Sequence, residues 1–164
     1  MMPSIVCNTG PLIALAMIDR LDLLKLLFRK VLVPEAVHGE ILQGGSASTG
    51  LSAYRQASWI KVIRLRKLPD PLLDSNLDVR EASVIQLARE RRAKLVLIDE
   101  RKARKVARNV YGLRLIGSAR VLVEARRQGH LESVSEAIRR IREGGYWIHD
   151  DIVRLALHEA GESP

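Results

Sequence analysis

The chain has 164 residues, of which 47% are hydrophobic and 4% aromatic, so we expect one globular domain over residues 1–164 with a core built mainly of aliphatic side chains. Lys and Arg total 27 against 19 Asp and Glu, and the net charge of +8 favours a polyanionic partner such as nucleic acid. The composition excludes a disordered chain, although the positive charge alone is equally typical of a solvated, salt-bridged surface.

The hydrophobic pattern predicts alternating strands and helices, followed by helices alone. Short branched apolar runs predict buried strands at residues 4–7, 31–33, 95–98 and 113–116, and a less buried strand at 60–65. Helical spacing predicts helices at residues 11–16, 21–28, 34–42, 51–57, 78–92, 101–110, 118–128, 134–142 and 151–160. Residues 44–50 form a Gly- and Ser-rich loop that is a candidate lid, and Pro69 and Pro71 break the chain. This order predicts an α/β fold with a mainly parallel sheet.

Small polar side chains follow two of the buried strands. Asn8 follows the first strand and Asp99 follows the strand at 95–98. In a parallel sheet all strands end at one edge, where ligands bind, so we expect Asn8 and Asp99 to face one crevice. The alternatives are that Asp99 caps the next helix, and that Asn8 is a turn residue bonded to its own backbone.

Two glutamates are further candidates for this crevice. Glu81 stands near the start of a predicted helix, and a helix that follows a strand starts at the same edge of the sheet. Its alternative role is in a capping box with Asp78. Glu40 lies in the helix after the second strand, between Val37 and Ile41, and its alternative role is that of an exposed helix residue. Three carboxylates and one amide oxygen suit a hard divalent cation such as Mg²⁺ or Mn²⁺.

These residues, in this order, resemble the PIN domain. Four blocks carry the resemblance, which covers nearly the whole chain: PLIALA, VPEAVHGEIL, EASVIQLA and LVLIDERKARKVA. They look closest to a PIN-like branch catalogued as a domain of unknown function. The resemblance implies a three-layer α/β/α sandwich with a parallel sheet of about five strands.

The resemblance also implies an activity. It points to a Mg²⁺- or Mn²⁺-dependent ribonuclease of the kind found as toxins in prokaryotic toxin–antitoxin pairs, in which water held by one or two metals attacks the RNA phosphodiester. Position by position, Glu40, Glu81 and Asp99 match the acidic ligands. Asn8 departs from the family pattern, which has Asp there, and removes one negative charge from the site. Leu97 and Gly10 also depart from residues common in the family.

The helix after Asp99 is rich in cations that lie near the proposed metal site. Arg101, Lys102 and Lys105 are therefore candidate RNA phosphate contacts, which would give salt-sensitive and largely sequence-independent binding. A solvated helix face is the alternative. Aromatic residues do not interleave with these cations, so base stacking is not indicated. Core packing or a partner surface is expected for Tyr146.

The remaining expectations concern compartment and partners. Cys7 is the only cysteine, and no leader precedes the first strand, so we expect a cytoplasmic protein without disulfides or membrane association. We expect RNA as substrate, an antitoxin protein as a possible partner, and a homodimer.

The leading hypothesis for function is thus a metal-dependent endoribonuclease. The alternative is a catalytically weak or inactive module that binds nucleic acid or a partner, because Asn8 replaces the usual Asp. A phosphatase-like hydrolase is disfavoured, since Asn8 cannot act as a nucleophilic carboxylate.

Overall fold

The computed structural model describes residues 1–44 and 50–163. The loop predicted at 44–50, with its role as a lid, lies almost entirely outside the described residues. The strands are β1 (Ile5–Cys7), β2 (Val31–Pro34), β3 (Ile60–Ile63), β4 (Leu95–Leu97) and β5 (Arg114–Ile116). The helices are α1 (Thr9–Met17), α2 (Asp22–Leu27), α3 (Glu35–Gln43), α4 (Leu51–Gln56), α5 (Pro71–Asn76), α6 (Val79–Arg91), α7 (Arg101–Asn109), α8 (Ser118–Arg127), α9 (Val134–Glu143) and α10 (Asp150–Glu159).

The strands form one parallel sheet in the order β3-β2-β1-β4-β5. The register aligns Cys7 with Leu97, and Leu97 with Ile116, so three strands end in the same row. The pairing continues one residue further, where the Asn8 backbone N–H donates to the Leu97 carbonyl at 3.0 Å. The segments that follow these three strands therefore leave the sheet together.

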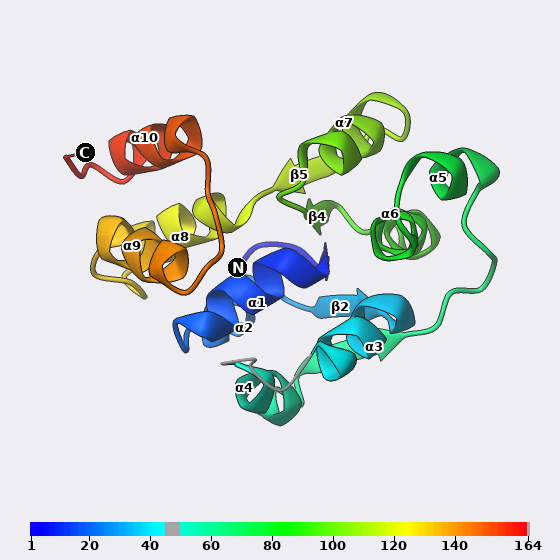
Figure 1. Ribbon diagram of the computed structural model, residues 1–164, viewed down its shortest axis with the longest axis horizontal. Coiled ribbons are helices and arrows are strands. Elements are labelled where there is room, and N and C mark those ends of the chain that lie inside the picture. The colour runs from blue at the N-terminus through cyan, green and yellow to red at the C-terminus, as the bar shows by residue number, and fades with distance from the viewer. Residues whose placement is uncertain (45–49, 164) are drawn as a thin grey trace.

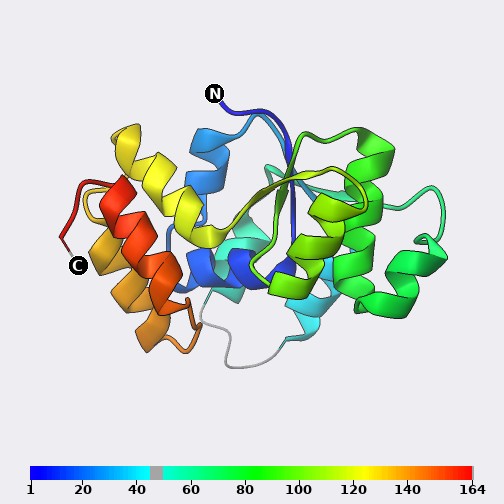
Figure 2. The same cartoon turned by 90° about the horizontal axis from the view of Figure 1, so that it is seen from above.

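Helices cover both faces of the sheet (Figures 1 and 2). Helices α6 and α7 pack on one face, whereas α1, α2 and α8 lie on the other. Helices α9 and α10 pack outside α8, and α3 contacts both α1 and α6 beside β2 and β3. This arrangement confirms the predicted α/β/α sandwich with five parallel strands.

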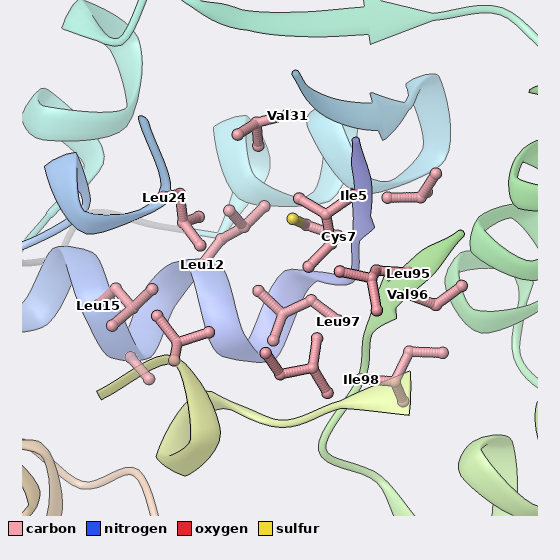
Figure 3. Packing of buried hydrophobic residues seen from close by; sticks show 14 of the residues in the cluster. Ile5, Cys7, Leu12, Leu15, Leu24, Val31, Leu95, Val96, Leu97 and Ile98 are labelled. Atoms are coloured by element: carbon pink, nitrogen blue, oxygen red, sulfur yellow. The ribbon is translucent and has the colours of Figure 1, made fainter. Parts of the chain in front are cut away.

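The core explains why such short strands are stable. Ile5, Val6, Cys7, Val96 and Leu97 are fully buried, as expected for strands covered on both faces. Figure 3 shows Leu12 of α1 pointing toward Ile5 and Cys7 of β1, with Leu15 further along the same helix. Burying each such side chain stabilises the fold by about 1.5–3 kcal/mol.

The structure corrects one part of the predicted element order. The sequence predicts only a chain break around Pro69 and Pro71, but Pro71 begins helix α5. Asp70 caps this helix by accepting a hydrogen bond of 3.0 Å from the Leu72 N–H. Proline suits the first helical position because its missing N–H would have no partner there. Among the described residues, no helix is long and apolar enough to cross a membrane.

Candidate active site

The sheet reverses its direction of growth between β1 and β4. The chain places β2 and β3 on one side of β1 and then returns to add β4 and β5 on the other side. Such a switch point opens a crevice at the ends of the strands, which is the usual ligand site of this architecture. Asn8 directly follows β1, and Asp99 comes two residues after β4, so the two residues flank this crevice.

Asn8, at the end of β1, carries an unused oxygen. The residue is 9% exposed, and it precedes α1 without forming a side-chain capping bond. Its Oδ1 atom is buried and has no hydrogen-bond partner. Buried polar oxygens are nearly always satisfied, so an unpaired one at this edge of the sheet fits a site that receives a donor or a cation. The predicted alternative, a turn residue bonded to its own backbone, does not occur.

Asp99 is held by three hydrogen bonds from the C-terminal part of the chain. Its Oδ1 accepts from the Ser118 N–H at 2.8 Å, and its Oδ2 accepts from the Ser118 hydroxyl at 2.7 Å. The Tyr146 hydroxyl also donates to Oδ2 at 2.5 Å. A carboxylate has about four lone-pair sites, so Asp99 can keep these bonds and still bind a cation. Burial, and then Asp99, raise the pKa of Tyr146, so Tyr146 remains a donor at neutral pH.

The neighbouring Glu100 caps helix α7, and Asp99 does not. Glu100 accepts from the Lys102 N–H at 3.0 Å and from the Ala103 N–H at 2.7 Å. The predicted capping of the next helix by Asp99 is therefore wrong, and the carboxylate instead accepts hydrogen bonds from Ser118, at the start of α8, and from Tyr146. Arg104, in the first half of α7, donates to the Ile98 carbonyl at 2.7 Å. Burial lowers the pKa of Arg104, and the negative charge of Asp99 opposes that shift.

Two glycines allow the chain to pack closely around Asp99. A Cβ atom at Gly117 would lie 2.9 Å from Oδ1 of Asp99, and a Cβ atom at Gly10 would lie 2.8 Å from the Tyr146 hydroxyl oxygen. Both distances are too short for ordinary contacts. The start of α1, the start of α8 and the Tyr146 segment therefore meet at this point only because neither position carries a side chain.

Glu40, on α3, is held in an ion pair. The Arg80 guanidinium donates to Oε1 of Glu40, and the Thr9 hydroxyl donates to Oε2 at 3.4 Å. Arg80 also donates to Asp78 at 2.8 Å. The Thr9 bond places Glu40 beside the residue that follows Asn8. The Glu40 side chain is 35% exposed, so it is neither a fully exposed helix residue nor a buried one.

Glu81 forms the predicted capping box at the start of α6. Asp78 accepts from the Glu81 N–H at 2.9 Å, and Glu81 accepts from the Asp78 N–H at 3.3 Å. Burial, and then the charge of Asp78, raise the pKa of Glu81, and Glu100 adds to the effect. Glu81 therefore occupies an acidic environment that a cation would relieve.

Comparison with known proteins identifies the family. A family model described as a PIN domain matches residues 4–162. The chain belongs to the PIN-domain family. Searches of curated proteins and of solved structures each returned no significant match. The match to the family model confirms the resemblance found in the sequence. The PIN domain is a nuclease-type fold that generally uses divalent metal ions.

The residues of this PIN domain fit a divalent cation by their chemistry. The oxygen donors of Asn8, Glu40, Glu81 and Asp99 are of the right kind, and the unpaired Oδ1 of Asn8 supports a ligand at this edge. In this arrangement the three carboxylates bind protein partners instead. Across residues 1–44 and 50–163, no three His, Cys, Asp or Glu side chains form a group that could hold a metal ion. The structure therefore does not bring Glu40, Glu81 and Asp99 together into one metal-binding group.

The predicted phosphate contacts lie beside Asp99. Arg101, Lys102 and Lys105 are exposed on α7, whose first turn follows Asp99 and Glu100. The buried Ala103 and Ala107 form the opposite side of this helix. The cations therefore face solvent next to the crevice, which fits contacts with RNA phosphates.

Sequence reasoning missed three residues that shape the site: Arg80, Ser118 and Tyr146. For Tyr146 the sequence predicts core packing or a partner surface. One signal for Ser118 was available, because it comes two residues after the predicted strand at 113–116. The contacts of Arg80 and Tyr146 span 40 and 47 residues, so no local pattern reveals them.

Proposed function

We propose that this PIN domain is a metal-dependent endoribonuclease. The unpaired, buried Oδ1 of Asn8, at the end of β1 and so at the switch point of the sheet, carries the proposal. Asp99, Glu81 and Glu40 would supply the carboxylate ligands, and Asn8 a neutral oxygen ligand. Mg²⁺ or Mn²⁺, when bound, supplies positive charge that polarises a phosphodiester and promotes the ionisation of water.

The residues of the chain would orient the substrate and the ligands. Ser118 and Tyr146 fix both oxygens of Asp99, so its direction is set before a cation arrives. Arg101, Lys102 and Lys105 would hold RNA phosphates along α7. The family and these cations together favour RNA as the substrate.

Cleavage of single-stranded RNA by the purified protein tests the proposal. We expect cleavage with Mn²⁺ or Mg²⁺, none with EDTA, and a rate at least about 100-fold lower for Asp99→Asn, since removing an electrostatic group from an active site typically costs about 10²–10³. Asp74→Asn on α5 is the matched control and should cleave normally, because Asp74 is exposed and outside the site. Full activity of Asp99→Asn, or full activity in EDTA, would refute the mechanism.

A toxin role in a toxin–antitoxin pair is a further part of the proposal, and it follows from the family resemblance. Induced expression in a prokaryotic host should then arrest growth for the wild-type chain and not for Asp99→Asn. Normal growth with the wild-type chain, at protein levels that cleave RNA in vitro, would contradict a toxin role.

A second candidate is a PIN module that binds RNA without cleaving it. The ion pair between Arg80 and Glu40, together with the neutral Asn8, favours this alternative because both weaken the negative charge of the site. It predicts RNA binding that weakens as salt rises, without cleavage products.

A further inference from the structure

Arg80 holds two carboxylates at the edge of the candidate site. One arm of its guanidinium donates to Oε1 of Glu40, and the other arm donates to Oδ2 of Asp78 at 2.8 Å. The side chain projects from the first turn of α6, next to Glu81. A fixed positive charge therefore stands among three acidic side chains.

This charge pairs with the carboxylate that helix α3 brings to the start of α1. The second oxygen of Glu40 accepts from Thr9 at 3.4 Å, and Thr9 directly follows Asn8. Since Asn8 contributes no negative charge, the pairing of Glu40 with Arg80 neutralises the carboxylate that α3 brings there. Arg80 repels a divalent cation that approaches Glu40, and the cation can bind Glu40 only if it displaces the guanidinium of Arg80.

We propose that Arg80 is a built-in counter-cation that competes with a divalent metal for Glu40 and so sets the metal affinity of the site. The inference rests on the proposed function in taking Glu40 as a metal ligand. Asp78 can retain the guanidinium when Glu40 is released, because Arg80 already binds both carboxylates. Arg80 is thus a positioning residue that controls when Glu40 is available.

A purely structural role for Arg80 would have a different signature. The side chains of Arg80, Glu40 and Asp78 are 39%, 35% and 42% exposed. Ion pairs this exposed contribute little to folding, so removal of the guanidinium should leave the melting temperature nearly unchanged. A change in metal affinity without a change in melting temperature therefore shows that Arg80 competes with the metal rather than stabilising the fold.

Titration with Mn²⁺ alone, followed by calorimetry and by electron paramagnetic resonance, tests the proposal. Arg80→Gln should bind Mn²⁺ about tenfold more tightly than wild type, because one competing charge is gone. Arg80→Lys keeps the charge and should stay closer to wild type. Arg139→Gln is the matched control, because Arg139 likewise bridges two carboxylates, Glu136 and Glu143, all on α9.

A second comparison keeps the test independent of folding and of catalysis. In the Arg80→Gln background, the further change Glu40→Gln should abolish the gain in Mn²⁺ affinity. If Arg80→Gln has a lower melting temperature than wild type, Arg80→Met repeats the test. Mn²⁺ affinity that stays at or below the wild-type value in both variants overturns the inference. Failure of RNA cleavage with a preserved gain in affinity would instead overturn only the proposed function.

Discussion

The Tyr146 hydroxyl donates a hydrogen bond of 2.5 Å to Oδ2 of Asp99, across 47 residues of sequence. This contact ties the segment between α9 and α10 to the end of β4, and it makes the C-terminal helices part of the candidate site. Ser118 adds two bonds to the same carboxylate from the start of α8. Asp99 is therefore oriented by residues that lie outside the sheet.

Removing the Tyr146 hydroxyl should weaken both the fold and the site. Tyr146→Phe should lower the free energy of unfolding by about 1–3 kcal/mol, because this change deletes a hydrogen bond to a charged group. Tyr111→Phe is the matched control, since the buried Tyr111 hydroxyl has no partner and its removal should be neutral or stabilising. Urea unfolding measures both variants, and equal effects would contradict the role given to Tyr146.

Restoring a charge at position 8 should strengthen metal binding. Asn8→Asp should raise Mn²⁺ affinity about tenfold and raise the cleavage rate, because affinity depends on ligand charge. Without metal the same variant should be less stable than wild type, since the new carboxylate would be buried without a positive partner. Thermal melts with and without Mn²⁺ measure both effects. An Asn8→Asp variant whose melting temperature does not change with Mn²⁺ would exclude Asn8 as a ligand position.

The stability of the protein should fall at alkaline pH. Burial, and then Cys7, raise the pKa of Tyr54 from 10.0 to about 12, and burial raises the pKa of the Cys7 thiol. Below the unfolded-state values both states keep their protons, so this contribution is fully present there. At higher pH the unfolded chain ionises while the folded chain does not, so stability falls until the pH reaches the folded-state values.

We therefore expect the free energy of unfolding to fall from about pH 9 upward. Urea unfolding at a series of pH values measures the slope. Tyr54→Phe should reduce the slope between about pH 10 and 12, because that variant lacks one of the titrating groups. A slope unchanged by Tyr54→Phe would show that Tyr54 does not titrate as proposed.

Salt should weaken RNA binding in a way that depends on α7. Replacing Lys102 or Lys105 with Gln should weaken binding of an RNA oligonucleotide and reduce the slope of log affinity against log salt by about one for each phosphate that the replaced lysine binds. Lys94→Gln is the control, because the exposed Lys94 precedes β4 and so lies at the opposite edge of the sheet. Equal effects at Lys94 and Lys102 would indicate general charge attraction only.

The sheet could be predicted from the sequence because burial on both faces leaves a local signal. The apolar runs around Val6 and Val96 are short, branched and continuous, and each is followed by a helix. Their order also places Asn8 and Asp99 at one edge without any knowledge of tertiary structure. Helix α5 was missed because Pro71 breaks a helix in its interior and begins one at its first turn, and spacing alone does not distinguish the two.

The chemistry of the site was predicted less completely than its position. Asp99 and Glu100 are adjacent carboxylates, and only the backbone direction decides that Glu100 caps α7. The partners of Asp99 and Glu40 come from distant segments, so their hydrogen bonds depend on tertiary packing. Leu97, which departs from the pattern that the resemblance implies, is fully buried in the core and supplies no polar group to the site.

A crystal soaked in Mn²⁺ shows whether Asn8 and Asp99 bind a metal ion. We predict an anomalous difference peak at the ends of β1 and β4, with oxygen ligands from Asp99 and Asn8 at about 2.0–2.3 Å. A crystal that shows no such peak at saturating Mn²⁺, while Asn8 Oδ1 stays unliganded and Glu40 stays paired with Arg80, would contradict it.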